Sequence, residues 1–336
     1  MYRILAALLG VFLLLAVLAP GAQAQEIQLS YANFPPAGTF PSVQMERWVQ
    51  EVQERTEGKV QIDTFPGGAL LGAKNMFRGV TQGQADIGCL SMAYQPGVFP
   101  LTSVLELPLG FSSAKQASKV LWELYQKHQP EEFAKVKVLT MFTSAPSNIM
   151  SKKAVRSLED LQGLELRASG TASRMLEELG ATPVSMPMPE TPEALQKGVV
   201  QGLLSSLEVL QDLDFAAYCP YVTMTELQVY PFAVVMNQEK WESLPQDVQQ
   251  VMQDLAQEQA LWTGRYMDEH VQESLEYAKN EHQVQAFELS QEDQQIIRER
   301  TRPVVQEWKE MAQEKGLDAE KVLQDVRQLR DEYAQE

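Results

Sequence analysis

Near the middle of the chain an arginine stands two residues before a run of small hydroxyl residues and glycine. Arg167 ends an apolar segment, and Ser169, Gly170 and Thr171 open a helical pattern that runs to Leu179. Such residues are favoured at helix starts, where free backbone N–H groups and the positive helix end attract anions. A guanidinium adds a planar fork that can bind a carboxylate through two parallel hydrogen bonds. The spacing indicates an anion site, while ion pairing of Arg167 with nearby glutamates on a wet surface explains it equally well.

The segments around Arg167 alternate between strand and helix patterns. Residues 158–202 predict a short helix, a strand ending at Arg167, a helix, a second strand and a further helix. The N-terminal part shows the same alternation, with expected strands at 26–34, 60–65, 85–92 and 136–144 and expected helices at 45–54, 75–82 and 114–128. This order is typical of an open α/β sheet, in which ligands bind beyond the carboxyl ends of the strands.

The last third of the chain is predicted to be helical after one apolar strand. Residues 229–237 form that strand, which could lead back to the first half of the protein. From Gln246 onward apolar residues recur at helical spacing, so one helix is expected from 246 to about 280. At ~1.5 Å per residue this helix would be roughly 50 Å long, enough to run along two lobes.

The N-terminus has the features of a secretion signal. Arg3 is followed by an apolar stretch from Ile4 to Leu18 and by Ala22-Gln23-Ala24, a small-x-small cleavage pattern. A membrane anchor is the alternative, but the apolar stretch is shorter than the ~20 residues that a spanning helix needs. We therefore expect residues 1–24 to be a signal peptide and the protein to be periplasmic. The remaining chain is long for a single core, which favours two lobes.

Charge and composition exclude several classes of function. The formal net charge is −17, a balance that repels nucleic acid and anionic lipid. The only cysteines, Cys89 and Cys219, are expected to be buried and free, and the three histidines show no metal-ligand spacing. No metal or other cofactor is expected. A periplasmic enzyme acting on an organic acid stays open as an alternative, although no nucleophile–base pair stands out in the sequence.

Several motifs in the right order resemble one family. The chain is similar to the periplasmic substrate-binding proteins of tripartite ATP-independent periplasmic (TRAP) transporters, of the C4-dicarboxylate-binding type. The resemblance covers nearly the whole mature chain and rests on LRASGTASRMLEELGATPVSMP with EALQKGVVQG, on VQERTEGKVQIDTFPGGALLGAKNMFRGVTQGQADIG, on LELPLGF and on NQEKWESLPQDVQQVM.

The resemblance implies a fold and a mode of action. It implies an α/β periplasmic binding protein with two lobes, a cleft between them, a long spine helix and a helical C-terminus. The expected bounds are 25–144 with 233–273 for lobe I and 145–232 with 274–336 for lobe II. Such a protein captures a small organic acid anion by closing its lobes. It then delivers the anion to the membrane subunits of the transporter, and we expect it to act as a monomer.

The resemblance also implies where the ligand binds. The family's matching arginine pairs with the ligand's carboxylate, a role carried here to Arg167. At the positions of a second arginine, an acidic residue and an asparagine, this chain places Thr143, Ser91 and Ser205, while the Ser-Asn pair that ends at Asn148 is retained. Aromatic residues at strand and loop ends complete the predicted site, and they include Phe40, Tyr94 and Tyr230.

These departures lead to a hypothesis about the ligand. Small neutral side chains replace groups that would bind a polar ligand, and the aromatic residues predict a roomy pocket with apolar walls. An aromatic or indole-type acid, anchored by Arg167, fits this pattern. A small sulfonate or a C4-dicarboxylate stays open, because serines and water can bind either.

Overall fold

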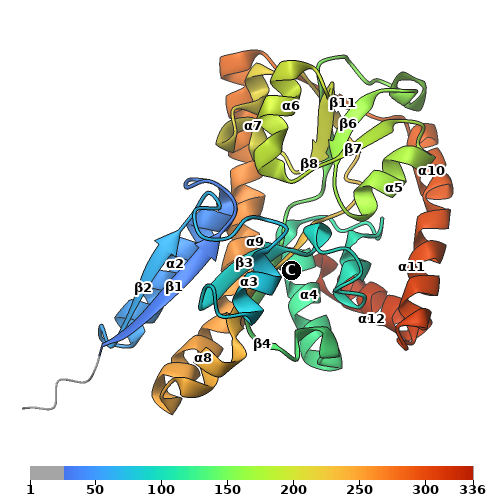
Figure 1. The fold of residues 1–336 in the computed structure, drawn as a ribbon. Coiled ribbons are helices and arrows are strands. Elements are labelled where there is room, and N and C mark those ends of the chain that lie inside the picture. Colours follow the sequence, from blue (N-terminus) through green and yellow to red (C-terminus); the bar gives the residue numbers. More distant parts are fainter. Residues whose placement is uncertain (1–25, 336) are drawn as a thin grey trace, which may run out of the picture.

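Two separate β-sheets organise the part of the chain that the structure, a computed structural model, describes, namely residues 26–335. The predicted signal peptide, residues 1–24, lies outside these residues. Each sheet carries its own helices, and we call the two resulting units the first and the second lobe (Figure 1). The predicted α/β fold with two lobes is thereby confirmed.

The first sheet has the order β2-β1-β3-β10-β4. Its strands are β1 (Ile27–Asn33), β2 (Val60–Phe65), β3 (Ile87–Ser91), β4 (Val136–Thr143) and β10 (Pro231–Asn237). β1, β2 and β3 are parallel, whereas β10 runs antiparallel between β3 and β4. The predicted return of the late apolar strand to the first half of the protein is therefore confirmed.

The second sheet has the order β11-β9-β5-β8-β6-β7. Its strands are β5 (Asn148–Ser151), β6 (Glu165–Ala168), β7 (Thr182–Ser185), β8 (Gly202–Ser205), β9 (Tyr221–Met224) and β11 (Gln285–Glu288). β6 is parallel to both β7 and β8, with Arg167 opposite Val184 and Leu203. The carboxyl ends of these three strands therefore meet at one edge, where the site is found.

Most expected helices form close to their predicted positions. They are α2 (Phe40–Arg55), α3 (Met76–Thr81), α4 (Ala114–His128), α5 (Thr171–Glu178) and α6 (Thr191–Lys197). Two short helices that were not predicted also form, α7 (Val209–Asp212) and α8 (Gln238–Ser243). α2 begins five residues before the expected position at Met45, because Pro41 fits the first turn of a helix, where no backbone N–H bond is needed. This early start places Phe40 at the cleft end of α2.

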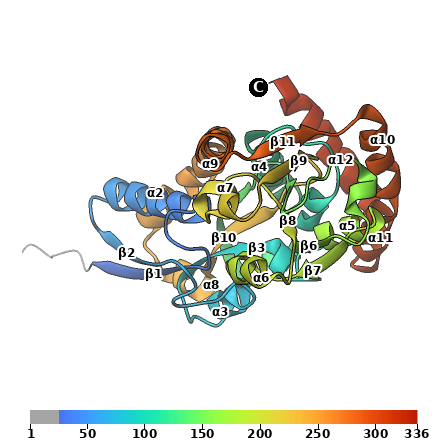
Figure 2. The same ribbon diagram turned by 90° about the horizontal axis from the view of Figure 1, so that it is seen from above.

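A single long helix joins the lobes. α9 (Gln246–His282) has 37 residues, as the spacing of apolar residues predicted, and ends at Gln283 in the left-handed conformation. It packs against α2, α4 and β4 of the first lobe and against α7 of the second. Figure 1 shows it running past both lobes, and Figure 2 shows it nearly end-on. The predicted spine helix is confirmed.

The C-terminal helices cross back over the first lobe. They are α10 (Gln291–Arg300), α11 (Arg302–Glu314) and α12 (Ala319–Glu332), on the side of the molecule opposite to α2 (Figure 2). Trp308 Nε1 donates to the carbonyl of Pro100 at 3.2 Å, and Gln116 Nε2 donates to the carbonyl of Arg330 at 2.7 Å. The predicted lobe bounds stay a prediction, and α11 and α12, which they assign to lobe II, contact residues that they assign to lobe I.

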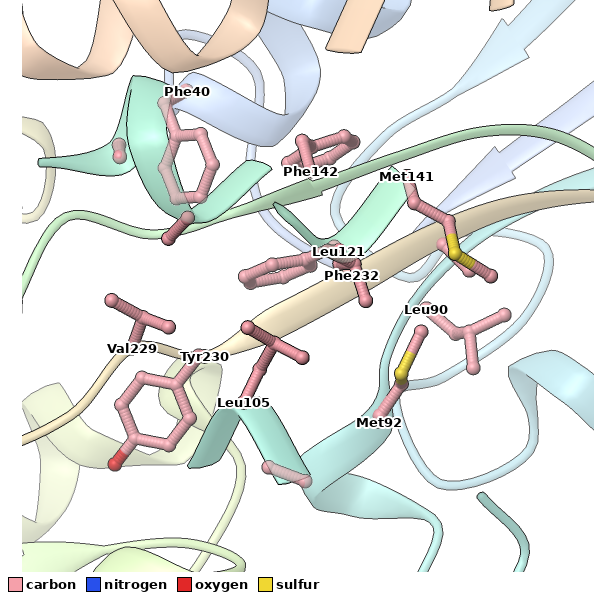
Figure 3. Packing of buried hydrophobic residues seen from close by; sticks show 14 of the residues in the cluster. Phe40, Leu90, Met92, Leu105, Leu121, Met141, Phe142, Val229, Tyr230 and Phe232 are labelled. Carbon is pink, nitrogen blue, oxygen red and sulfur yellow. The ribbon is translucent and has the colours of Figure 1, made fainter. Parts of the chain in front are cut away.

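An aromatic cluster forms the core of the first lobe next to the cleft. Phe142 and Phe232 are stacked with ring centroids 5.3 Å apart, and the edge of Phe40 packs against both. Figure 3 shows Tyr230 at the margin of this cluster, with its hydroxyl pointing away from the phenyl rings.

Cys89 and Cys219 are buried and free, as expected. None of the helices within residues 26–335 combines the length and the apolarity that crossing a bilayer requires.

Candidate ligand-binding cleft

A cavity of about 60 Å³ lies where the two lobes meet. Its walls come from the end of β3 and the starts of β10 and α2 in the first lobe, and from the ends of β6 and β8 in the second. Six of the eight residues that the sequence predicted for the site line this cavity: Phe40, Ser91, Tyr94, Arg167, Ser205 and Tyr230.

Arg167 is held rigidly at the base of this cavity. Its side chain is buried, with 1% of the residue exposed. Nε and Nη2 donate to the carbonyl of Met186 at 3.0 and 2.8 Å, and Nη2 also donates to the Tyr94 hydroxyl at 2.9 Å and towards Ser169 Oγ at 3.5 Å. Met186 follows β7, the strand beside β6, so sheet register sets the position of the guanidinium.

Every partner of Arg167 is neutral. Among residues 26–335 no carboxylate oxygen lies within 4.0 Å of its guanidinium, and the hydrogen bonds of Arg167 come from Nε and Nη2. Charged side chains are almost never fully buried without an opposite charge, because desolvation of a lone ion costs several kcal/mol. The surface ion pairs considered for this residue therefore do not form, and the buried charge of Arg167 has no acidic partner in the described part of the chain.

Tyr94 connects the two lobes at the site. It ends the 3-10 helix η1 (Met92–Tyr94), directly after β3. Its hydroxyl accepts hydrogen bonds from Arg167 and, at 3.0 Å, from the backbone N–H of Met188, both in the second lobe. The edge of its ring packs on Phe34 with centroids 5.4 Å apart. Tyr94 thus orients the guanidinium from across the cleft.

Three other predicted residues that line the cavity, Ser91, Ser205 and Tyr230, carry polar groups. The hydroxyl of Tyr230 donates to the carbonyl of Leu204 at 3.3 Å, and burial raises the pKa of that phenol to about 12, so it stays protonated. Ser91 lies opposite Phe232 in the first sheet. Ser205 ends β8, beside the strand that carries Arg167.

Thr143 and Asn148 lie outside the cavity lining. Side chains alternate along a strand, so Phe142 faces the aromatic cluster while the hydroxyl of Thr143 points to α4, 3.3 Å from Ser118 Oγ. Asn148 Oδ1 accepts from the backbone N–H groups of Thr225 and Glu226 at 2.8 and 3.0 Å and so fixes a turn. Their assignment as ligand-binding residues stays a prediction that the geometry does not favour.

The sequence suggested that the start of α5 directs free N–H groups at the anion site, but the first of these groups is engaged elsewhere. The backbone N–H of Thr171 donates to Glu106 Oε2 at 2.9 Å, and Glu106 belongs to the 3-10 helix η2 (Thr102–Glu106) of the first lobe. A carboxylate from the opposite lobe therefore occupies this helix end. Arg167 acts apart from it, at the neighbouring strand end.

Four further polar residues gather in or beside the cavity, and the sequence analysis did not find them. Ser206, Glu208 and Asp212 line it, and His270 of α9 contacts Asp212, with Nε2 2.7 Å from Oδ1. The run Ser205-Ser206 followed by Glu208, directly after a strand, was the available signal. Burial, with the charge of Asp212 as a smaller cause, raises the pKa of Glu208 to about 8. Within residues 26–335 no cluster of His, Cys, Asp and Glu is arranged to hold a metal ion.

Two α/β lobes, a cleft between them and a buried arginine without an acidic partner define an extracytoplasmic solute-binding protein. The family model for bacterial extracellular solute-binding protein, family 7 (DctP), matches residues 31–311. The chain therefore belongs to this family, and it is a solute-binding protein of the TRAP type.

Solved structures support this assignment. The chain is 62% identical to a TRAP periplasmic solute-binding protein from Desulfovibrio salexigens, with a TM-score of 0.84 and coverage of 92% of this chain and 97% of that one. That structure is an open complex with the C-terminus of a symmetry mate in its ligand-binding site. A marine metagenome protein specific for aromatic acid ligands is 27% identical, with a TM-score of 0.88 and coverage of 92% and 100%.

Two more distant relatives show a range of ligands in this fold. A Bordetella bronchiseptica TRAP protein with bound mandelate is 25% identical, with a TM-score of 0.85 and coverage of 91% and 99%. The C4-dicarboxylate-binding protein DctB of Bacillus subtilis is 22% identical, with coverage of 84% of this chain and 82% of that one.

Proposed function

We propose that this protein captures a small monocarboxylate in the periplasm and delivers it to the membrane subunits of a TRAP transporter. The observation that carries the proposal is the buried guanidinium of Arg167, which lines the cleft without an acidic partner among residues 26–335. A carboxylate bound there would supply the missing charge and accept from Nη1. The pair would be shielded from water, where charged hydrogen bonds are strong.

The apolar walls favour an aromatic or indole-type acid as the ligand. Phe34, Phe40, Phe232 and Val209 line the cavity together with small serines, so a flat apolar body can lie against rings and methyl groups. The relatives support this choice, since the metagenome protein is specific for aromatic acids and the Bordetella protein holds mandelate. In the Desulfovibrio relative the site holds the C-terminus of a symmetry mate, a group that ends in a carboxylate.

Other parts of the proposal concern cell location and assembly. We infer that residues 1–24 direct export and are removed, and that the mature protein acts as a monomer without turning over the bound acid. Small sulfonates and C4-dicarboxylates are the competing ligands. A sulfonate offers the same negative charge to Arg167, and DctB is a relative named for dicarboxylate binding.

Calorimetry with substituted proteins tests the function. Wild-type protein is titrated with benzoate, phenylacetate, indole-3-acetate, benzenesulfonate and succinate. Arg167→Ala should weaken binding of the best acid by ~2–5 kcal/mol, because the charged hydrogen bonds are lost from a closed site. Arg167→Lys should also bind poorly, since an ammonium lacks the planar fork.

A matched control separates the site from general charge. Arg298→Ala removes an exposed arginine of α10 and makes the same change in net charge, so it should bind the acid like the wild type. The proposal fails if Arg167→Ala binds the best acid within about threefold of the wild type, less than ~0.7 kcal/mol. Tighter binding of succinate or benzenesulfonate than of every monocarboxylate would change the ligand class and leave the anchor in place.

A further inference from the structure

The cavity is also lined by a buried carboxyl group, that of Glu208. Glu208 follows β8 and precedes α7, is 3% exposed, and lines the same cavity as Arg167. Its Oε2 atom is buried and forms no hydrogen bond of 3.5 Å or less within residues 26–335, and neither does the neighbouring Ser206 hydroxyl, which lies near enough to Glu208 to lower the pKa of its carboxyl slightly. Buried polar groups are normally hydrogen-bonded. Two such groups in one loop at a ligand cavity therefore mark a place that a bound molecule fills.

Glu208 is not reserved for a partner in the protein. It lines one cavity with Arg167, yet no ion pair of 4.0 Å or less joins the two in the described part of the chain. Asp212, the acid at the end of α7, has both carboxylate oxygens engaged. Its Oδ1 contacts His270 Nε2 at 2.7 Å, and its Oδ2 accepts from the backbone N–H of Phe40 at 3.2 Å. Glu208 and Ser206 are thus the groups of the loop that are left for a ligand.

The chemistry of these two groups selects a hydroxyl. A hydroxyl can donate to the Glu208 carboxyl and accept from Ser206 at the same time, whereas a methyl group can do neither. Burial raises the pKa of Glu208 to about 8, so near neutral pH its carboxyl is mostly protonated. A protonated carboxyl offers no negative charge to a ligand ammonium. A ligand hydroxyl, by contrast, can form a hydrogen bond with the carboxyl in either of its protonation states.

We propose that the ligand carries a hydroxyl group separate from its carboxylate, and that Glu208 and Ser206 bind this hydroxyl while Arg167 holds the carboxylate. The chemical class is a hydroxy-substituted monocarboxylic acid. This inference rests on the proposed function, because it takes the carboxylate at Arg167 as given. Glu208 then acts as a specificity-determining residue, since leaving a buried polar group unpaired penalises ligands without the hydroxyl.

Matched ligand trios test the inference by calorimetry. Benzoate, 3-methylbenzoate and 3-hydroxybenzoate form one trio, and the 4-substituted benzoates and phenylacetates form others. In the best trio the hydroxy acid should bind the wild type at least about tenfold more tightly than its methyl analogue. Glu208→Leu should remove this preference while retaining affinity for the methyl analogue, and Ser206→Ala should reduce it. Glu193→Leu, the same change at an exposed position of α6, should leave the preference unchanged.

Each outcome decides a specific point. Equal binding of hydroxy and methyl acids by the wild type in every trio overturns the inference and leaves the role of Arg167 intact. The inference is also overturned if Glu208→Leu keeps the preference, or if 3-(aminomethyl)benzoate binds more tightly than every hydroxy acid. The wild-type comparison decides the matter even if Glu208→Leu does not fold. Failure of every acid to bind would overturn the proposed function, and this inference with it.

Discussion

The carboxylate of Glu106 accepts a 2.9 Å hydrogen bond from the backbone N–H of Thr171. Glu106 belongs to the first lobe and Thr171 begins α5 of the second, so this bond crosses the boundary between them. The helix end carries a partial positive charge that favours a carboxylate. A second bond crosses the same boundary, from Arg167 to Tyr94. Contact between the lobes is therefore made by polar groups beside the ligand cavity.

Glu106 should make stability depend on pH. Burial raises the pKa of its carboxyl from 4.5 to about 6 in the folded protein. Because the folded pKa is raised, the contribution to stability is fully present below pH 4.5 and is lost as pH rises through 6. Relative to Glu106→Gln, the wild type should lose ~2 kcal/mol of unfolding free energy as pH rises from below 4.5 to above 6. Urea denaturation of both proteins at acidic and neutral pH measures this, and a constant difference would contradict it.

Gly170→Ala should destabilise the contact between the lobes. The backbone of Gly170 has φ 58° and ψ −143°, a backbone conformation that residues other than glycine rarely adopt. An added Cβ would lie 2.4 Å from Glu106 Oε2 and 2.9 Å from Ala93 Cβ. Backbone strain alone costs ~1–3 kcal/mol, and displacement of Glu106 adds to it.

Gly198→Ala is the control for this substitution. Gly198 also has a positive φ, 73°, but no atom lies within 4 Å of the added Cβ, so only strain of ~1–2 kcal/mol is expected. Urea denaturation should show the larger loss for Gly170→Ala, together with weaker binding of the cognate acid. Equal losses and unchanged affinity would mean that the Glu106 contact carries little energy.

His270 should titrate at a higher pH than an ordinary histidine. Its hydrogen bond with Asp212, 2.7 Å long, is the largest cause that raises its pKa above 6.5. A raised folded pKa stabilises the protein below pH 6.5 and loses this effect as pH rises through the folded value. The chain has only three histidines, so their ring signals can be assigned by substitution in an NMR titration. Asp212→Asn should lower the midpoint of His270, and an unchanged midpoint would exclude the pairing.

Ligand should shift the protein towards a more compact form. Two lobes linked by β10 and the spine helix α9 can hinge, and an anion bound at Arg167 favours the state in which Tyr94 reaches the guanidinium. Small-angle scattering should give a smaller radius of gyration with saturating acid. Arg167→Ala, given the same acid, should show no change. Identical wild-type curves would remove closure from the mechanism without excluding binding.

The sequence determined the secondary structure and the principal anion-binding candidate because both depend on short-range patterns. Period-two alternation predicted the strand at 60–65, helical spacing predicted the helix at 114–128, and the apolar repeat after Gln246 predicted the spine helix. The place of Arg167 at a strand end, together with the family resemblance, made it the candidate anchor residue. Each of these signals lies within a few turns of the chain, where periodicity and local propensity are readable.

Only the tertiary structure decided which polar groups face the cavity. β10 inserts between β3 and β4, and strand alternation then turns Thr143 towards α4, a result that sequence position does not contain. Likewise, long-range packing brings Glu106 to the backbone N–H of Thr171. The same packing buries Glu208 Oε2 without a hydrogen-bond partner among the described residues. Burial and pairing of a charge depend on such neighbours, so the polar groups of the candidate site could be placed only in the folded protein.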